Sequence, residues 1–563
     1  MNNMYKTTYM FIQAVIIGVL TALAAIAFRS LITFFQSGFN YTGHTVLSFM
    51  GRYYVIVIPA IGGLAVGLLT KYFANEARGA GVPEVINAVA NLGGRIRKRV
   101  VIVKALACSI YIGSGGSVGR EGPIIHIGSA IGSSVGQSLK LTRHQVKNLV
   151  ACGAAAGIAA TFNAPIAGVL FAMEIVLRDI SRFSFGLIVI SSVVASSIAR
   201  AYYGNAPAFK ITPYTLNHYS ELILYLALGI VCAGTALLFV RTVSSLEKYF
   251  NISRIPDIAK PVLGGLLIGV IGLYFPQIFG VGYGSIEQAL GGMMSLKILF
   301  LLVFLKMAAT SISIASGGSG GYFAPSLFIG AMTGGTLGRV FEMMFPSLHI
   351  NPGSYSLVGM AALFAAAAQA PISTIIILFE LTDDYRIILP LMLSCVVSNS
   401  VYNHFNRDSI YTEKLTAQGI YIPPSGQISL FDSIAVRDAM IEQVDTVLDT
   451  EMVGDIIKKI EQTHHKHLPV LNKKSELIGV ISLKDIKDTP AKTLLKDIIN
   501  PEFKHCLPDQ SLNSALGRMD INNIGWLPVV DETNPKKMLG IITRKSLLEA
   551  YNNMKNGSLD KEV

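Results

Sequence analysis

The residues with the strongest chemical character lie in the stretch GSGGSVGREGPIIHIG, residues 113–128, inside otherwise apolar sequence. Burial of a charge in apolar surroundings is costly, so Arg120 and Glu121 are functional candidates. Pro123 favours a first helical turn, while Gly119 and Gly122 let unpaired backbone N–H groups approach a ligand closely. A helix that begins here directs partial positive charge at that ligand. The stretch therefore predicts an anion site; the alternative is a glycine-rich turn that packs helices.

The same spacing recurs in the second half of the sequence. Pro123 and Pro325 are 202 residues apart, and glycines follow each of them at intervals of five, four and four residues. In a second pair of motifs, Glu174 and Glu380 each stand nine positions past a proline that follows an alanine. Paired glycine-rich breaks in two halves indicate a site between repeats, where the starts of broken helices face an anionic substrate.

A membrane is the setting that the composition predicts for these loops. Of the 563 residues, 52% are hydrophobic and only 14% are charged, against roughly 25% charged residues in soluble domains. Several apolar segments are shorter than the roughly 20 residues of a perpendicular span, so many helices are expected to be tilted or broken. The first segment lacks a small-residue cleavage site, which favours a retained helix over a signal peptide. The apolar segments cover residues 9–35, 55–72, 100–112, 149–160, 186–199, 222–240, 262–274, 296–314 and 387–401.

The charged residues indicate how the chain is oriented in the membrane, whereas the cysteines and histidines indicate no metal site. The net charge is +11, and the dense basic loop at residues 95–99 is predicted to be cytoplasmic by the positive-inside tendency. Because the positive charge is spread between the apolar segments, nucleic-acid binding is disfavoured. The five cysteines form no C-x-x-C pair, so neither a disulfide framework nor a metal site is expected. For His464, His465 and His467, a solvated turn is favoured over a metal site.

These motifs resemble the CLC family of chloride channels and chloride/proton antiporters over nearly the whole chain. GAGVPE (residues 79–84) resembles the family's first anion loop, GREGP (119–123) is identical to its second, and GYFAP (321–325) resembles its third. FNAPIAGVLFAME (162–174) and FELTDDYRIILP (379–390) match in order and spacing. The resemblance implies an all-α polytopic membrane domain over residues 1–420, built from two inverted-repeat halves of tilted and broken helices. It also implies a homodimer with a pore in each subunit.

The resemblance also implies roles for individual residues. Glu121 matches the gating glutamate, whose carboxylate occupies an anion site and leaves it on protonation. Arg120 is given mainly a structural or field-shaping role, because an arginine fixed on the path would bind chloride too tightly for conduction. Tyr411 falls where the family places a hydroxyl at the central anion site; the alternative is an interfacial tyrosine. The implied anion-binding positions are Gly79, Ala80, Gly81, Gly119, Arg120, Gly122, Pro123, Gly321, Tyr322, Phe323, Ala324, Pro325 and Tyr411, with backbone N–H groups near Gly122, Phe323 and Ala324 as the expected donors.

Two positions depart from the family pattern. Ala80 stands where many members have a serine, so the selectivity among small anions is open. Ile175 stands where antiporters usually carry a second glutamate that accepts protons from the inner side. Isoleucine cannot relay a proton, which leans toward a passive channel, but a water chain or another carboxylate would restore proton delivery. Channel and antiporter therefore both stay open. Glu174 is interpreted as a structural or interfacial carboxylate, because Glu380 duplicates its position.

The composition changes near residue 420. A proline and glycine linker over residues 421–429 precedes a soluble α+β region that is itself doubled, since HLPVL (467–471) corresponds to WLPVV (526–530). This region resembles a tandem of CBS domains, at residues 430–490 and 491–555, and is expected to be cytoplasmic. The resemblance implies either adenine nucleotide binding, with Ser482, Asp485 and Thr543 as candidates, or stabilisation of a dimer. No other cofactor and no metal are expected.

The predicted function is transport of chloride or a similar small anion through a pore gated by a protonatable glutamate, as an H+/Cl− antiporter or a passive channel. The expected setting is the plasma membrane (bacterial inner membrane), and the expected partners are the anion, protons, membrane lipid and a second copy. A CBS-regulated magnesium transporter is the alternative, but it would need clustered carboxylates in the membrane. An enzyme is disfavoured, because GSGGSVGRE lacks the lysine and hydroxyl of a phosphate-binding loop and no nucleophile and base emerge.

Overall fold

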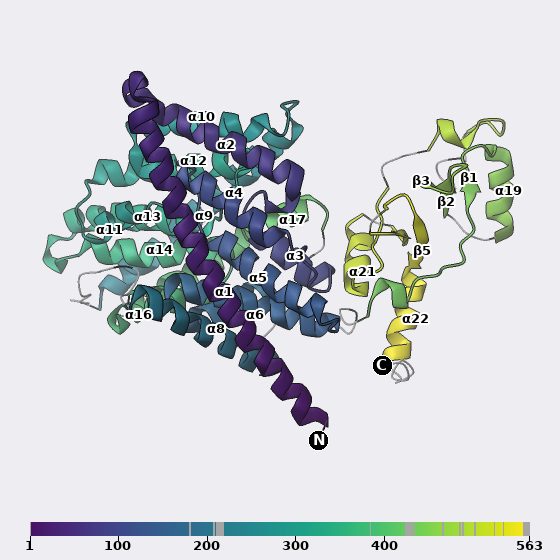
Figure 1. Cartoon of the computed structure of the whole chain (residues 1–563), viewed down its shortest axis with the longest axis horizontal. Coiled ribbons are helices and arrows are strands. Elements are labelled where there is room, and N and C mark those ends of the chain that lie inside the picture. Colours follow the sequence, from purple (N-terminus) through teal and green to yellow (C-terminus); the bar gives the residue numbers. More distant parts are fainter. Residues whose placement is uncertain are drawn as a thin grey trace. The chain divides into compact units, whose positions relative to one another are not determined.

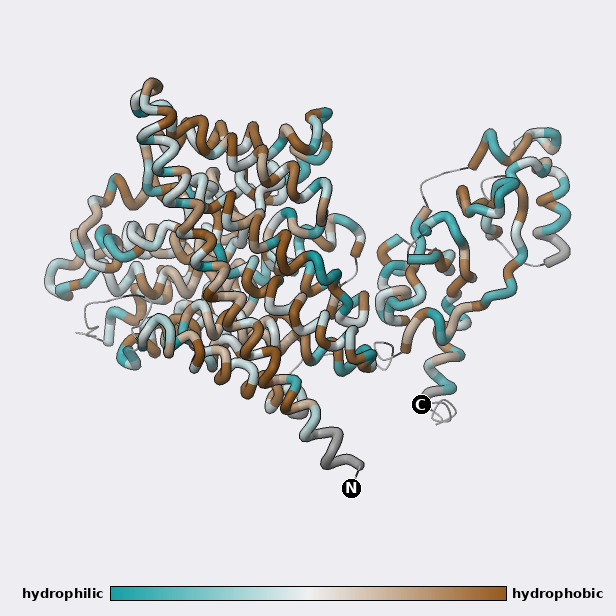
Figure 2. The backbone as a smooth tube through the Cα atoms, in the orientation of Figure 1, coloured by the Kyte–Doolittle hydropathy of each residue, from teal (hydrophilic) through white to brown (hydrophobic). Residues whose placement is uncertain are grey.

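The computed structural model describes residues 2–178, 182–205, 209, 219–382, 384–420, 422, 431, 434–463, 467–482, 486, 489–499, 503–522, 524–532 and 534–555. These residues form two units. Gly94–Gln418 and nearly all of the chain before it belong to a helical unit, and Gln427–Val563 belongs to the second. Hydrophobic residues run along most helices of the first unit (Figure 2).

The helical unit is made of α-helices joined mostly by short turns (Figure 1). Every apolar segment predicted from the sequence coincides with a helix of the structure. Among the described residues, six helical segments are long and apolar enough to cross a membrane by length and composition, whereas others such as α4 and α10 are shorter. The helices are α1 (Asn2–Tyr41), α2 (Tyr54–Phe73), α3 (Val82–Asn91), α4 (Val100–Gly113), α5 (Glu121–Ser138), α6 (Arg143–Phe162), α7 (Pro165–Phe171), α8 (Arg182–Tyr203), α9 (Glu221–Ile252), α10 (Ala259–Tyr274), α11 (Tyr283–Leu290), α12 (Leu296–Ala315), α13 (Phe323–Met344), α14 (Pro352–Ala368), α15 (Pro371–Thr382), α16 (Ile388–Phe405) and α17 (Glu413–Ala417).

Helices α2 and α10 show that the two halves run in opposite directions. They lie side by side (Figure 1), and glycines allow their backbones to touch. A Cβ on Gly63 would collide with the carbonyl oxygen of Pro261, and a Cβ on Gly265 would collide with that of Pro59. Adding 202 to Gly63 gives Gly265, and subtracting 202 from Pro261 gives Pro59, so the first contact is converted into the second. The two halves are therefore related by a pseudo-twofold axis, and the two helices are antiparallel.

Each half also caps a short helix of the other half. The Glu174 carboxylate accepts hydrogen bonds from the N–H groups of Ile372 and Ser373, at 3.4 and 2.7 Å, at the start of α15. The Glu380 carboxylate accepts two such bonds, at 3.1 and 2.7 Å, at the start of α7. A carboxylate in this position satisfies free N–H groups and complements the partial positive charge of the helix. These contacts agree with a structural role for Glu174.

The C-terminal unit is an α+β structure in two copies. The first copy has a sheet in the order β1-β2-β3, in which β1 is parallel to β2 and β2 is antiparallel to β3. The second copy pairs β4 with β5 in the same antiparallel register, and both hairpins have an irregularity at the end of their first strand. The elements are β1 (Val447–Leu448), α19 (Val453–Thr463), β2 (His467–Leu471), β3 (Leu477–Ser482), α21 (Leu512–Ile521), β4 (Trp526–Val530), β5 (Met538–Thr543) and α22 (Arg544–Lys555).

Each copy buries one face of its helix against its strands. Ile456 of α19 packs with Val470 of β2, and Ala515 of α21 packs with Val529 of β4. The two similar copies agree with the doubled α+β region that the sequence predicted. The candidates His464, His465 and Asp485, and the predicted linker apart from residue 422, lie outside the described residues.

Candidate functional site

Short backbone ladders bring the three glycine loops together. Gly119 and Gly321 exchange two hydrogen bonds, with N–H to oxygen distances of 2.9 and 2.7 Å. The N–H of Gly79 donates to the oxygen of Gly318 at 3.0 Å, and the N–H of Gly320 donates to the oxygen of Gly79 at 3.2 Å. Gly119 and Gly321 are equivalent positions of the two halves, so the pseudo-twofold axis passes between them. The structure thus places the three loops side by side, and for the second and third loops the duplicated spacing predicted this.

The close contact of these loops explains one of their glycines. A Cβ on Gly122 would lie 2.5 Å from the oxygen of Ala80 and 3.0 Å from Cα of Gly321, so no side chain fits. Helices α3, α5 and α13 begin within two residues of this contact, at Val82, Glu121 and Phe323. The first N–H groups of a helix have no partner within the helix, so three helix starts with free donors converge here.

The carboxylate of Glu121 occupies this convergence. The side chain is fully buried, and its Oε1 accepts a hydrogen bond from the Tyr283 hydroxyl at 2.5 Å and lies 3.9 Å from Arg120 Nε. Its Oε2 is buried and has no hydrogen-bond partner within the described part of the chain. A Cβ on Gly119 would overlap this oxygen and lie 3.1 Å from the backbone N of Ala324. The unpaired oxygen therefore lies beside the start of α13.

Tyr283, whose hydroxyl is bonded to Glu121, was missed by the sequence analysis. It follows Gly282, which has a left-handed backbone (φ 84°), and it begins α11. The Arg120 guanidinium lies over its ring, 5.5 Å from the ring centre. A sequence signal was present, because GVG at residues 280–282 repeats GAG at residues 79–81, and this second-half counterpart of the first loop marks a place where the chain approaches the site.

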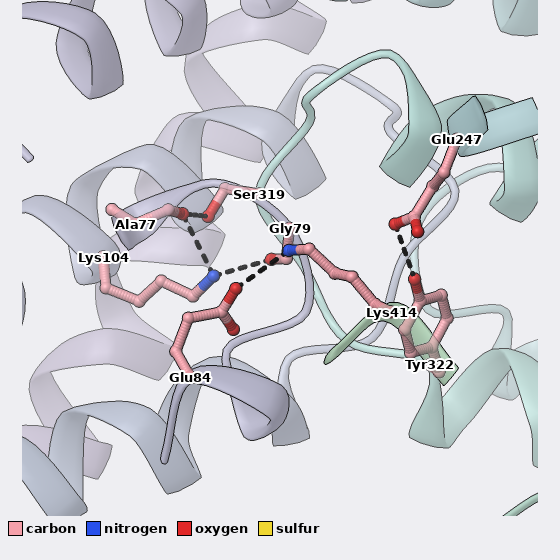
Figure 3. Close-up of polar contacts among 8 residues, drawn as sticks. All are labelled: Ala77, Gly79, Glu84, Lys104, Glu247, Ser319, Tyr322 and Lys414. Carbon is pink, nitrogen blue, oxygen red and sulfur yellow. Dashed lines mark hydrogen bonds and ion pairs between the residues drawn. The ribbon is translucent and has the colours of Figure 1, made fainter. Parts of the chain in front are cut away.

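Two buried lysines hold these counterpart loops and were also missed. The Lys104 ammonium donates to the oxygens of Ala77 and Gly79, at 3.1 and 2.7 Å (Figure 3). Lys306, which is 202 residues further on, makes two such bonds at 2.9 and 2.8 Å in the loop before α11. A lysine within an apolar run is a functional suspect, and this signal could have identified both. Each ammonium group thus ties two carbonyl oxygens of its loop together.

The remaining predicted side chains, those of Tyr411, Tyr322 and Ile175, are all buried. Tyr411 is buried, and its backbone N–H donates to Ser409 Oγ at 3.3 Å. The Tyr322 hydroxyl donates to Glu247 Oε1 at 3.3 Å (Figure 3). Ile175 is buried in a π-helical turn, Ala172–Leu177, and carries no polar group. All of the implied anion-binding positions except Arg120 are buried.

Two cavities open near the loops. One of about 810 Å³ is lined by Arg29, Arg120 and Tyr283, and we call it the Arg120 cavity. The other, of about 1020 Å³, is lined by Gly79, Glu84, Glu247 and Lys414, and we call it the Glu247 cavity.

The two cavities lie at opposite ends of α2. The Arg120 cavity includes Tyr54 at the start of this helix, and the Glu247 cavity includes Asn75, just past its end. A helix of 20 residues is about 30 Å long, which is the thickness of a bilayer core. The glycine loops contribute residues to the walls of both cavities and therefore lie between them. The two cavities are separated by about the length of α2.

Comparison with known proteins identifies the architecture. A family model described as voltage gated chloride channel matches residues 62–403, and the CBS domain model matches residues 436–491 and 495–553. This chain belongs to the voltage-gated chloride channel family. It is therefore a polytopic membrane protein, and the predicted family and fold class are confirmed.

Individual relatives cover most of the helical unit. The "Putative chloride channel protein ClcB-like" of Ralstonia nicotianae is 32% identical over 71% of this chain and 95% of its own length. The "H(+)/Cl(-) exchange transporter ClcA" of Salmonella arizonae is 32% identical over 68% of this chain and 83% of its own length. A crystal structure of a slow cyanobacterial Cl−/H+ antiporter superimposes with a TM-score of 0.67 at 27% identity, covering 73% of this chain and 97% of the other. The magnesium-transporter alternative is not favoured by these matches.

The C-terminal candidates are described only in part. The Thr543 hydroxyl accepts a hydrogen bond from the N–H of Ser546 at 3.1 Å, so it caps the start of α22. Ser482 ends β3, and Asp485 lies outside the described residues. In the described ranges there is no group of three or more His, Cys, Asp and Glu side chains that could hold a metal ion.

Proposed function

We propose that this protein transports chloride across a membrane in exchange for protons, with the Glu121 carboxylate as its gate. The observation that carries the proposal is the buried carboxylate at the joined starts of α5 and α13, with Oε2 unpaired among the described residues. A carboxylate in this position is a tethered substitute for a free anion. The similarity to transporters named for H+/Cl− exchange supports the same conclusion.

The geometry provides a way for protonation to open the path. The ionised Glu121 is attracted by the free N–H groups of the helix starts and by the Tyr283 hydroxyl. A proton on the carboxylate removes the negative charge, which weakens both attractions and lets chloride take the place of the side chain. Backbone N–H groups then bind the chloride through partial charges only, and such moderate binding at several points is what conduction requires.

The wider setting follows from the same proposal. Arg97 of the basic loop lines the Glu247 cavity, so this cavity is assigned to the cytoplasmic side by the positive-inside tendency. We assign the protein to the plasma membrane, as a homodimer in contact with lipid, with the CBS unit in the cytoplasm. For the CBS unit, dimer stabilisation is favoured over adenine nucleotide binding, because the Thr543 hydroxyl already caps a helix.

Passive conduction of chloride is the second candidate function, and Ile175 is the observation that favours it. This buried isoleucine occupies the position at which antiporters of the family usually carry their inner glutamate. If no other carboxylate supplies protons from the cytoplasmic side, Glu121 exchanges protons with one side only. Chloride then moves without a coupled proton.

The experiment is flux from chloride-loaded liposomes that contain the full-length protein, with chloride and internal pH recorded together. We expect the wild type to move protons against their gradient as chloride leaves. Glu121→Gln is expected to keep chloride flux and to lose proton movement, because glutamine cannot titrate. Glu342→Gln, a half-exposed carboxylate near the far end of α13, is the control and should behave as the wild type. Proton coupling that persists in Glu121→Gln refutes the gate assignment, and chloride flux without proton movement in the wild type supports the channel instead.

A further inference from the structure

The Glu247 cavity contains five carboxylates, and their partners divide them into two groups. Three form salt bridges: Glu76 with Arg97, Glu84 with Lys414 at 3.0 Å, and Asp257 with Lys260 at 3.0 Å. The other two accept hydrogen bonds from neutral groups. A carboxylate paired with a cation stays ionised, whereas one bound to a neutral donor is free to gain and lose a proton.

Glu247 and Glu413 are the carboxylates bound to neutral donors. Glu413 accepts from the side-chain amide of Asn406 at 3.2 Å, a contact within its own segment of the chain. Glu247 accepts from the Tyr322 hydroxyl at 3.3 Å, which links α9 to the third anion loop (Figure 3). Of the two, Glu247 is the one in contact with the site.

Tyr322 gives Glu247 a direct connection to the gate region. Its ring is 2% exposed, and its hydroxyl faces Glu247 at the cavity wall. Its neighbour Gly321 is bonded to Gly119, and the N of Ala324, two residues further on, lies near the unpaired oxygen of Glu121. The third loop therefore contacts Glu247 through Tyr322 and lies beside the Glu121 carboxylate through Ala324.

None of the described cations around Glu247 forms a salt bridge with it that would hold it in its ionised form. Lys414, which lines the same cavity, is committed to Glu84. Helix α9 ends at Ile252, so its last carbonyl groups add negative potential near Glu247. The charged groups that line the cavity with Glu247 are Lys248 on its own helix, Glu84 of α3, Lys260 of α10, Glu413 and Lys414 of α17, and Glu76, Arg78, Arg97 and Asp257 of the connecting loops.

We infer that Glu247 is the inner proton acceptor of this protein and takes the place of the carboxylate that is missing at Ile175. A hydronium ion of the cytoplasmic cavity gives its proton to the Glu247 carboxylate and becomes water. Glu247 then gives the proton to water in the path, which delivers it to the Glu121 carboxylate, and Glu247 returns to its ionised form bound to Tyr322. No other reactant is required, and each proton that enters at Glu247 leaves at Glu121.

The test compares Glu247→Gln with Glu413→Gln in the chloride-loaded liposomes described above. For Glu247→Gln we expect chloride flux to persist and the proton flux to fall by about 10²-fold or more, the usual effect of removing a general acid or base. Glu413→Gln, the matched carboxylate of the same cavity, should keep the wild-type proton to chloride ratio. Glu247→Asp, which keeps a titratable group, should retain part of the proton flux. An unchanged ratio in Glu247→Gln, or an equal loss in Glu413→Gln, overturns the inference.

A second variant covers the case in which Glu247→Gln does not fold. Tyr322→Phe keeps the carboxylate and removes its only hydroxyl contact in the described structure, so proton flux should fall while chloride flux persists; no change overturns the inference. The inference rests on the proposed exchange, but the two fail differently. A wild type that moves chloride without protons refutes both, whereas a wild type that exchanges while Glu247→Gln exchanges equally well refutes the inference alone.

Discussion

Replacement of Tyr283 by phenylalanine isolates the contact that is expected to hold the proposed gate closed. The substitution keeps the ring beneath Arg120 and removes the hydroxyl that donates to Glu121 Oε1 at 2.5 Å. A hydrogen bond to a charged group contributes about 1.5–3 kcal/mol. At 1.4 kcal/mol for each tenfold change, the closed position of Glu121 should be weakened by about 10- to 150-fold relative to the open one.

Chloride binding provides the measurement. The carboxylate and the anion compete for one place, so the apparent Kd for chloride is the intrinsic Kd divided by the fraction of protein in which Glu121 has left the site. Tyr283→Phe should therefore lower the apparent Kd by up to about the same 10- to 150-fold, measured by calorimetry on the purified protein at a pH at which Glu121 is ionised.

A double-mutant cycle with Glu121→Gln is the control for this prediction. Without a competing carboxylate, Tyr283→Phe should have little further effect on chloride affinity, because the two residues act through one interaction. The reasoning is refuted if Tyr283→Phe alone leaves the Kd unchanged, or if it shifts the Kd equally in the Glu121→Gln background.

Two further predictions concern packing and pH. Gly122→Ala should prevent folding or markedly lower the melting temperature in detergent, because its Cβ would meet backbone atoms of Ala80 and Gly321. Gly234→Ala is the control: a Cβ at Gly234 would enter open space, so this variant should be as stable as the wild type or more stable by up to about 1 kcal/mol. Equal melting temperatures of the two variants would contradict the packing argument. Burial, and to a smaller extent the charge of Arg518, lowers the pKa of His505 below its ordinary 6.5. Below about pH 6.5 the folded CBS unit therefore binds fewer protons at His505 than the unfolded chain does. The stability of the folded unit is expected to decrease as the pH falls below that value. The fluorescence of Trp526, the single tryptophan, should report this loss in the full-length chain, and His505→Gln should reduce it; an identical pH response of the two proteins would exclude His505 as a cause.

Much of the fold could be predicted from the sequence, because equivalent residues of the two halves recur at a constant offset. The offset of 202 between Pro123 and Pro325 recurs between Lys104 and Lys306 and between Gly119 and Gly321, and in the structure these are equivalent positions. The apolar segments likewise coincide with helices, because a helix that faces lipid or other helices needs a continuous run of apolar side chains.

The polar contacts of the site were less predictable. Tyr283, Glu247 and Lys414 are 162, 126 and 293 residues from Glu121, and nothing in the sequence links any of them to that residue. Their partners are set by which helix ends the folded chain brings together. A residue type shows that burial of its side chain is costly in free energy. It does not show which group in the folded chain offsets that cost.

By itself, the sequence determined the family, the helical membrane domain in two halves, the doubled α+β region and the gate candidate Glu121, since these depend on local composition and on repeated spacing. Only the tertiary structure decided that Tyr283 is bonded to Glu121, that Glu174 and Glu380 cap helices of opposite halves, and that Glu247 contacts the third loop while Lys414 is bound to Glu84. The reason is that hydrogen bonds and ion pairs act over a few ångströms in space, and separation along the chain does not report that distance.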